Sequence, residues 1–280
     1  MSVLEVKNLC KKYPAFELRN ISFSLKKGKI TGFIGRNGAG KSTTLKALFN
    51  FVHPDNGDIL FFDNKFRDIE FNIKQRVGFV SGGIDYYSKK KIKTITAITK
   101  SFYDKWDETA YSKYMTMFRL DENKTPSQLS AGMKVKYALT LALSHNAELL
   151  VLDEPTSGLD PVSRDDLLDV FMELSDKGIT ILFSTHITSD LDKCADNIIY
   201  IKNGMLLAES DIKSFVNSYK VLELTKDQLT PDLQPKLIGC KRSKNGLTSL
   251  IRTDDAAGLD IDYADADLES IMVHIEREGE

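Results

Sequence analysis

The segment GRNGAGKST at residues 35–43 constrains this 280-residue chain more than any other feature. Its spacing of glycine, four residues and then Gly-Lys-Ser lets a backbone loop wrap around the phosphates of ATP or GTP. The glycines let amides turn inward, the lysine reaches the outer phosphates, and the serine hydroxyl supplies an oxygen for Mg²⁺. The residues expected to hold the nucleotide are therefore Gly35, Arg36, Asn37, Gly38, Ala39, Gly40, Lys41, Ser42 and Thr43.

The flanks of this loop provide the context that such a motif needs. The apolar run at residues 29–34 predicts a strand, and residues 43–51 predict a helix with Leu45, Leu48 and Phe49 on one face. The amides at the start of that helix would point toward the phosphates. The alternative is a glycine-rich turn that binds nothing, and the order of strand, loop and helix argues against it.

The composition is that of an ordinary globular protein, with 42% hydrophobic and 28% charged residues. No apolar run approaches the about twenty residues of a membrane-spanning helix, and the first 13 residues lack the apolar block of a signal peptide. We therefore expect a cytosolic chain that meets a membrane only through a protein partner. The formal net charge of −2, without a basic and aromatic stripe, makes nucleic acid an unexpected partner. No metal-ligand or disulfide spacing relates the three cysteines Cys10, Cys194 and Cys240.

Strand-like runs surround the phosphate loop. Residues 3–6 and 18–25 alternate in polarity and predict a small β layer, and residues 58–62 and 76–80 predict two further short strands. From residue 148 to residue 201, strand-like runs alternate with helical ones. This alternation predicts a parallel sheet with helices on its faces.

Helical spacing replaces the strand pattern between residues 91 and 122, which we interpret as an inserted helical subdomain. We expect one buried face to contain Ile95, Ile98 and Phe102, and another to contain Tyr111, Met115 and Phe118.

The pattern loosens beyond about residue 215. The short apolar pieces VLEL and KLIGC precede an acid-rich stretch at residues 254–269, which we interpret as a solvated face. A closing helix is expected because apolar residues then recur at helical spacing, at Leu268, Ile271, Met272 and Ile275. The sequence leaves open whether this region braces a dimer, regulates the protein or covers a sheet edge.

The run LLVLDE at residues 149–154 places two carboxylates at the end of an apolar strand. Open α/β sheets bind their ligands at this end of the strands. Asp153 is suited to hold Mg²⁺, directly or through water, and Glu154 is suited to polarise an attacking water molecule. A turn acid at a strand end is the alternative, which the upstream phosphate loop makes weaker.

With LSAGM at residues 129–133, followed by LLVLDEPTSGLDP at residues 149–161, the chain resembles ABC-type ATPases, whose signature usually reads LSGGQ. The resemblance implies that Ser130 and Gly132 of one subunit close over the γ-phosphate held by the phosphate loop of another. ATP is then sandwiched in a head-to-tail dimer. From the residues alone, Ser130 is also a good N-cap for a helix over residues 131–144.

Further marks of the family follow in order. The segment Ser-Gly-Leu-Asp ending at Asp160 is similar to the loop that crosses the dimer interface, and Asp160 before Pro161 is also a good helix cap. His186 matches the histidine that contacts the γ-phosphate and orients the attacking water. Tyr13 fits the aromatic residue that stacks on adenine, with nearby Phe16 as its competitor.

The chain departs from the family pattern in two places. Ala131 and Met133 replace the usual glycine and glutamine of the signature. Ser81 or Gly82 stands where the family has a glutamine that touches Mg²⁺ and faces the membrane subunit. Our hypothesis is that coupling to a partner runs instead through residues 85–87, so that substitution of Tyr86 and Tyr87 would uncouple transport from hydrolysis.

The resemblance implies an α/β fold: a P-loop NTPase of ABC type with an antiparallel β layer, a mostly parallel core sheet, a helical subdomain and a small C-terminal α+β appendix. We expect the ATPase domain at residues 1–215, its helical subdomain at about 88–147, and the accessory region at 216–280.

The implied function is ATP hydrolysis, with Mg²⁺, that powers an ABC transporter, of the exporter kind by analogy. The implied partners are membrane-spanning permease subunits, which would hold the chain at the inner face of the cell membrane, and a second copy or a related ATPase subunit. A soluble ABC ATPase of an assembly or regulatory complex is the alternative. A regulatory module with degenerate catalysis is a third possibility, against which Glu154 and His186 argue.

Overall fold

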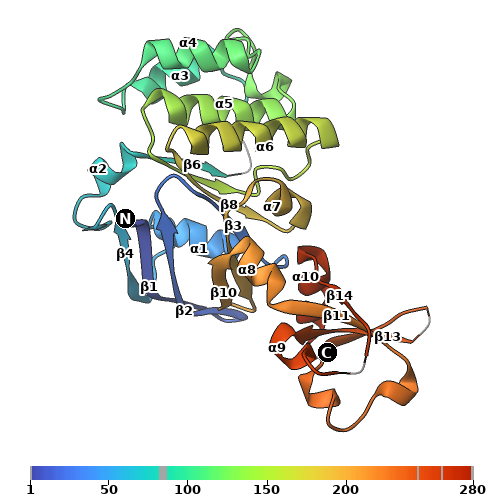
Figure 1. The fold of residues 1–280 in the computed structure, drawn as a ribbon. Helices are drawn as coiled ribbons and strands as arrows, with labels where there is room; N and C mark the ends of the chain where they lie inside the picture. The colour runs from blue at the N-terminus through green and yellow to red at the C-terminus, as the bar shows by residue number, and fades with distance from the viewer. Residues whose placement is uncertain (1, 82–86, 245, 260, 279–280) are drawn as a thin grey trace.

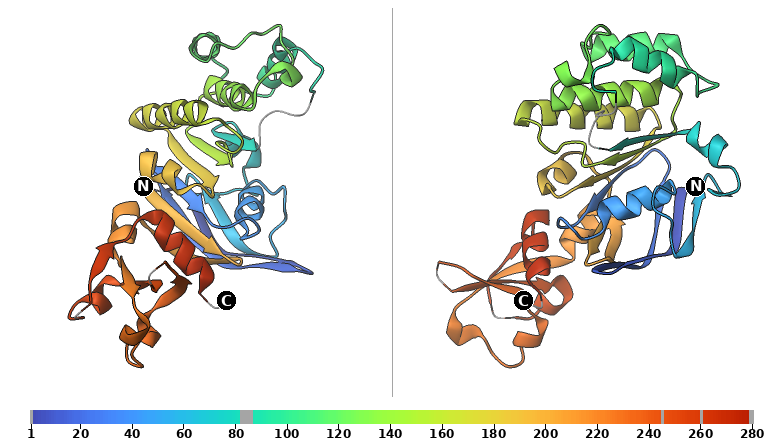
Figure 2. Two further views of the ribbon diagram at one scale, coloured as in Figure 1. Left: turned by 90° about the vertical axis from the view of Figure 1, so that its right-hand side faces the viewer. Right: turned by 180° about the vertical axis from the view of Figure 1, so that it is seen from behind.

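The computed structural model describes residues 2–81, 87–244, 246–259 and 261–278, and it arranges their strands in three sheets (Figures 1 and 2). The central sheet has the order β10-β9-β3-β8-β7-β6 and is parallel except for β10. Its strands are β3 (Ile30–Ile34), β6 (Val77–Ser81), β7 (Leu149–Asp153), β8 (Thr180–Thr185), β9 (Asn197–Lys202) and β10 (Met205–Asp211). The predicted parallel sheet is confirmed, and β10 is an addition that the sequence pattern did not indicate.

The predicted antiparallel β layer is also confirmed, with the order β2-β1-β4-β5. It is formed by β1 (Ser2–Tyr13), β2 (Phe16–Lys26), β4 (Asn56–Phe61) and β5 (Asn64–Lys65). The first two strands are longer than predicted because their pairing continues up to Tyr13 and Phe16 at the hairpin end.

Helices cover both faces of the central sheet, as a mostly parallel sheet requires. Residues of one β-strand alternate between two cores: Leu150 and Leu152 pack with α5 and α6, whereas Leu149 packs on the side of α1. Figure 1 shows α5 and α6 on one side of the sheet and α1 on the other. The helices of this part of the chain are α1 (Lys41–Leu48), α2 (Glu70–Lys74), α5 (Ala131–Ser144), α6 (Pro161–Asp176), α7 (Thr188–Cys194) and α8 (Ile212–Asn217).

The inserted segment contains α3 (Ile92–Lys100) and α4 (Glu108–Met117), followed by the 3₁₀ turn Pro126–Gln128. The predicted face of Tyr111, Met115 and Phe118 is buried. The other predicted face is wrong, because Ile98 is 44% and Phe102 65% exposed. The buried side of α3 instead includes Thr96, whose hydroxyl is hydrogen-bonded to the hydroxyls of Tyr111 and Tyr137. A search for apolar residues at helical spacing therefore does not find the buried face of this helix.

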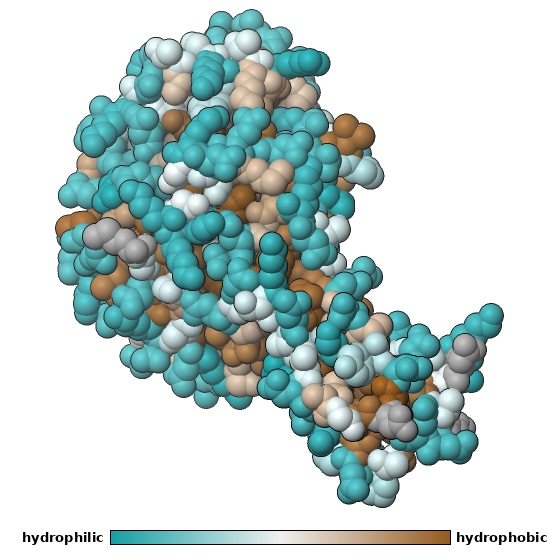
Figure 3. Space-filling model, viewed as in Figure 1, coloured by the Kyte–Doolittle hydropathy of each residue, from teal (hydrophilic) through white to brown (hydrophobic). Residues whose placement is uncertain are grey.

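The C-terminal region forms a third sheet, which is antiparallel and has the order β12-β13-β11-β14. Its elements are β11 (Tyr219–Leu224), β12 (Ile238–Arg242), β13 (Leu247–Arg252), β14 (Tyr263–Asp265), α9 (Thr253–Ala256) and α10 (Leu268–Arg277), with 3₁₀ turns at Lys226–Gln228 and Gln234–Lys236. The closing helix is confirmed as α10, and Leu268, Ile271 and Ile275 on it are buried. In the space-filling view this region projects from the main body, and hydrophilic side chains cover most of both parts (Figure 3).

The cysteines and the lengths of the helices bear on two further expectations from the sequence. All three cysteines are free thiols. Among the described residues, no helix has both the length and the apolar character needed to span a membrane.

Candidate functional site

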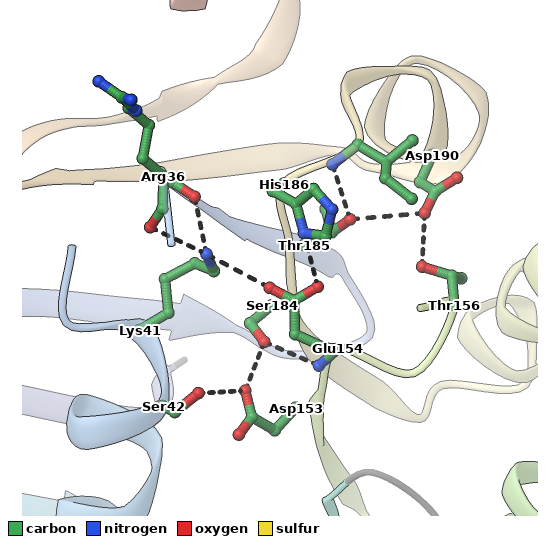
Figure 4. A network of polar contacts seen from close by, with 12 residues as sticks. Arg36, Lys41, Ser42, Asp153, Glu154, Thr156, Ser184, Thr185, His186 and Asp190 are labelled. Atoms are coloured by element: carbon green, nitrogen blue, oxygen red, sulfur yellow. Dashed lines mark hydrogen bonds and ion pairs between the residues drawn. The ribbon is translucent and has the colours of Figure 1, made fainter. Parts of the chain in front are cut away.

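The carboxyl ends of three neighbouring strands meet at one edge of the central sheet. In the parallel register, Ile34 of β3 pairs with Thr185 of β8, and Asp153 of β7 pairs with Ser184 of β8. The phosphate loop after β3, His186 after β8 and Glu154 after β7 are therefore brought side by side (Figure 4).

The phosphate loop folds around the side chain of its lysine. Gly40 precedes α1 with a φ of 115°, and a Cβ at this position would lie only 2.6 Å from a methyl carbon of Leu18. Only glycine meets both requirements. The buried Lys41 donates hydrogen bonds from Nζ to the carbonyl oxygens of Gly35, at 2.7 Å, and Arg36, at 3.3 Å. The loop thus encloses one ammonium group at the start of a helix.

Glu154 joins two cationic or potentially cationic side chains. Its Oε1 lies 3.3 Å from Lys41 Nζ, and its Oε2 lies 2.9 Å from His186 Nδ1. The backbone of Glu154 has a φ of 51°, in the left-handed region that non-glycine residues rarely adopt. Such strain persists where surrounding contacts impose it, often at functional sites. The three predicted residues therefore form one contact group.

Asp153 contacts the serine that follows Lys41 in the phosphate loop. Its Oδ1 accepts hydrogen bonds from Ser42 Oγ, at 3.0 Å, and Ser184 Oγ, at 2.7 Å. The Ser184 hydroxyl in turn accepts a bond from the Glu154 amide at 2.9 Å. Sequence reasoning missed Ser184, although its place at the end of a strand beside LLVLD was a usable signal.

These oxygens fit Mg²⁺. The ion prefers oxygen ligands and usually takes one or two from a protein, together with phosphates and water. The Ser42 hydroxyl and the Asp153 carboxylate, 3.0 Å apart, are such a pair. The described residues contain no cluster of three or more His, Cys, Asp or Glu side chains that could hold a metal ion by themselves.

A second layer of buried groups supports the site and was not predicted. Asp190 on α7 accepts a hydrogen bond from the Thr156 hydroxyl at 2.6 Å and a long one from Thr185 at 3.5 Å. Burial raises the pKa of Asp190, and Arg164 lies 3.9 Å from its other oxygen. The loop after Glu154 and the segment after His186 are thereby tied to the same carboxylate (Figure 4).

A cavity of about 610 Å³ lies over the phosphate loop. Its lining residues come from the phosphate loop, the β1–β2 hairpin and the ends of β7 and β8: Ala15, Phe16, Arg36, Asn37, Gly38, Gly40, Lys41, Ser42, Thr43, Glu154, Ser157 and His186. The lining includes Phe16 but not Tyr13, which is 38% exposed beside Lys11. The geometry therefore favours Phe16 as the aromatic wall, and adenine stacking by Tyr13 stays a prediction.

The signature residues do not line this cavity. Ser130 caps α5 by accepting a bond from the Met133 amide, and Asp160 caps α6 by accepting bonds from the Val162 and Ser163 amides. Both predicted caps are confirmed. Hydrogen bonds from Ser163 hold the pKa of Asp160 below its usual value, so its carboxylate stays ionised.

Gly132 lies between the starts of the two helices. A Cβ added there would lie 3.5 Å from Leu159, just before α6 begins. Within one chain, Ser130, Gly132 and Asp160 are thus grouped outside the cavity that contains Lys41. The predicted contact of Ser130 and Gly132 with a γ-phosphate requires a second chain.

The segment that departs from the family pattern is described only in part. Ser81 ends β6 and is the register partner of Asp153, which puts it beside the proposed metal site. Gly82, Asp85 and Tyr86 lie outside the described residues. Tyr87 is 57% exposed.

Comparisons with known proteins agree with this site. The ABC transporter family profile matches residues 18–157. The ABC transporter ATP-binding protein YtrB of Bacillus subtilis (strain 168) is 28% identical over 211 residues, which cover 75% of this chain and 72% of that protein. The bacitracin transport ATP-binding protein BcrA of Enterococcus faecalis is 31% identical over 214 residues, with coverages of 75% and 70%.

A solved structure described as the ATP binding subunit of an ABC transporter superposes with a TM-score of 0.69 at 28% identity, and the match covers 76% of this chain and 91% of the other. The range matched by the family profile contains the phosphate loop and the paired carboxylates Asp153 and Glu154. The chain therefore belongs to the ABC transporter family, as one of its ATP-binding ATPase subunits.

Proposed function

We propose that this subunit powers export by hydrolysing ATP, with Mg²⁺, between two copies of the chain or between this chain and a related ATPase subunit. It would be held at the inner face of the cell membrane by membrane-spanning permease subunits. Similar proteins are named for bacitracin transport, linearmycin resistance and lantibiotic transport, which supports export of a compound of that kind. The observation that carries the proposal is the contact group of Lys41, Glu154 and His186.

This contact group suggests how ATP would start the reaction. In the present structure the carboxylate of Glu154 is the anionic partner of Lys41. The outer phosphates of ATP would take its place, because they bring more negative charge to the same ammonium group. Glu154 would then be free to accept a proton from water.

Hydrolysis follows from the positions of the same residues. A water oxygen attacks the γ-phosphorus, the bond to the β–γ bridging oxygen breaks, and the proton moves to Glu154, which leaves ADP and phosphate. His186 would orient the water and contact the γ-phosphate. Ser42 and Asp153 would hold Mg²⁺, whose chemistry is to neutralise charge on the β- and γ-phosphates.

An apolar patch around α2 supports a membrane partner. Phe51 and Phe71 are each 60% exposed and Phe102 is 65% exposed. All three adjoin α2, since Phe71 lies on it, Lys74 lies 5.9 Å from the Phe51 ring centre, and the Gln75 side chain donates to the Phe102 carbonyl. Single exposed apolar residues are common, but a cluster marks a docking surface. We assign this patch to a cytoplasmic helix of the permease.

The test is co-purification from detergent-solubilised native membranes, using a tagged chain with Glu154→Gln and ATP present. We expect a protein with several membrane spans to be recovered, and we expect Phe71→Ala together with Phe102→Ala to abolish its recovery. Leu207→Ala, at a 46% exposed position on β10, is the matched control. Recovery of soluble partners alone, from a chain that still binds ATP, would instead favour the assembly-complex alternative.

In the recovered complex, substitution of Tyr86 and Tyr87 tests the proposed route of coupling. We expect transport to be lost while ATP hydrolysis continues. Unchanged coupling would exclude this segment.

A further inference from the structure

A second cavity, of about 590 Å³, adjoins the nucleotide cavity and has α10 as one wall. The two cavities share Arg36 and His186. The other lining residues come from the segment after β8 and from α10: Ile187, Thr188, Ser189, Glu269, Met272, Val273, Glu276 and Arg277. A helix of the C-terminal region therefore borders the space in front of the catalytic histidine.

The position of α10 is fixed by contacts to the central sheet. The buried Tyr200 of β9 donates a hydrogen bond to Glu276 at 2.8 Å, and Lys202 donates to the carbonyls of Ile275 and Glu278 at the end of the helix. At its start, Asp267 and Ser270 cap each other reciprocally. Figures 1 and 2 show α10 as the part of the C-terminal region that lies against the main body. These hydrogen bonds hold α10, and with it this wall of the cavity, against the central sheet.

The second cavity has both an apolar portion and charged side chains. Ile187, Met272 and Val273 give it an apolar portion, and Arg36 and Arg277 add positive charge. Glu276 is already engaged by Tyr200, and Glu269 lies at the opposite end of α10 from Arg277. A matching ligand would combine an apolar side chain with a carboxylate near the Arg277 end.

The chain itself presents such a segment. Val162, in the first turn of α6, is 71% exposed, more than any other exposed large hydrophobic residue in the described ranges. Two residues before it, Asp160 stays ionised. A Cβ added to Gly158 would meet nothing within 4 Å, so the loop leading to this turn is open.

We propose that α10 and the segment after β8 form a surface that receives residues 157–162 of a second copy of the chain. This inference rests on the proposed ATP-bound dimer and adds the C-terminal region to its interface. Continuity with the nucleotide cavity and the match of charge and apolar surface support it. In a two-fold pair the contact forms twice, because each chain supplies both the cavity and the segment.

The test is a double-mutant cycle on ATP-dependent dimerisation, measured by sedimentation in the Glu154→Gln background. We expect Val273→Glu and Val162→Lys each to raise the dimer dissociation constant at least tenfold, because the proposed contact places Val162 against the apolar portion of the cavity. A chain with both changes should recover to within about threefold of the parent, because the new glutamate would face the new lysine of the partner. Arg242→Glu, on an exposed part of β12 outside the cavity, should have no effect.

If the parent dimerises and the two single variants match it, the inference is wrong while the proposed dimer stands. If the effects of the two changes simply multiply, the two residues do not meet, and the pairing is wrong. If the parent binds ATP but stays monomeric, both the dimer and this surface are overturned. Fluorescent-nucleotide binding and thermal unfolding of each variant would verify that it is folded.

Discussion

The nucleotide edge of the central sheet and the C-terminal sheet are built on different principles. At the nucleotide edge, polar groups from the start of α1 and from the ends of β7 and β8 contact one another, and each contact requires a particular residue type. The C-terminal sheet is stabilised mainly by the burial of apolar side chains. Leu222 and Ile251 pack in a small separate core, and the neighbouring Tyr219 and Leu250 pack in the main core. Chemistry fixes residue identity at the first region, whereas the second needs only apolar residues of suitable size.

The largest effect is expected at the nucleotide edge, from Glu154→Gln. The change should lower kcat for ATP hydrolysis about 100-fold to 1000-fold, because the proton acceptor is lost, while ATP binding is retained. A phosphate-release assay and a fluorescent-nucleotide titration measure the two effects. Glu173→Gln, at an exposed position on α6, is the matched control. Equal hydrolysis by the Glu154 variant would remove this residue from the reaction.

The C-terminal sheet should respond in the opposite way. Leu222→Ala, at a fully buried position, should lower the free energy of unfolding by about 2–5 kcal/mol through lost burial and a new cavity. The kcat of the folded fraction should change less than about twofold. Urea unfolding measures the first quantity, with the exposed Leu207→Ala as control. A large loss of kcat with unchanged stability would mean that this sheet acts on catalysis.

A pH effect should appear in the main body, away from both regions. Burial lowers the pKa of His145 to about 4, from 6.5 in an unfolded chain. The unfolded state therefore binds the proton first as pH falls, so stability decreases between about pH 6.5 and 4 and then levels off. The loss should be at most about 3–4 kcal/mol. His145→Gln should remove this part of the pH dependence, and an unchanged difference between pH 7 and pH 4 would contradict it.

The smallest effect is expected where the two regions join. Tyr200→Phe removes the hydrogen bond to Glu276 and should cost about 1 kcal/mol of unfolding free energy. Tyr263→Phe, at a 49% exposed position on β14, is the control. Equal stability of both variants would show that this bond does not hold α10 on the sheet.

The same contrast explains what the sequence could predict. The phosphate loop, Asp153 and Glu154 occur in motifs whose residue types follow from phosphate and Mg²⁺ chemistry, and His186 was identified through the resemblance to the family; the structure brings them into contact. Ser184, Thr156 and Asp190 were missed because a buried hydroxyl or carboxylate that orients a neighbour belongs to none of those motifs. The choice between Tyr13 and Phe16 depends on the hairpin's shape, which a local pattern does not contain.

Predictions of the fold failed where the buried residues did not recur at the spacing of a half-exposed strand or of an amphipathic helix. In β13, three successive residues are buried, so this strand lacks the alternation of apolar and polar residues that marks a half-exposed strand, whereas β12 and β14 are mostly exposed. On α3, the buried Thr96 displaced the predicted apolar face, because its hydroxyl is satisfied by two tyrosines. Both cases are tertiary effects that no short segment reveals.

The central claim is that ATP is hydrolysed between two chains, with Lys41 from one and Ser130 from the other. The most direct test mixes two inactive variants, Lys41→Ala and Ser130→Asp. Aspartate still caps a helix but would repel the γ-phosphate. A mixed dimer carries both changes in one site and none in the other.

We therefore predict that each variant alone is inactive and that the mixture recovers ATP hydrolysis, up to about a quarter of the wild-type rate if pairing is random. A mixture as inactive as its components would contradict the shared site.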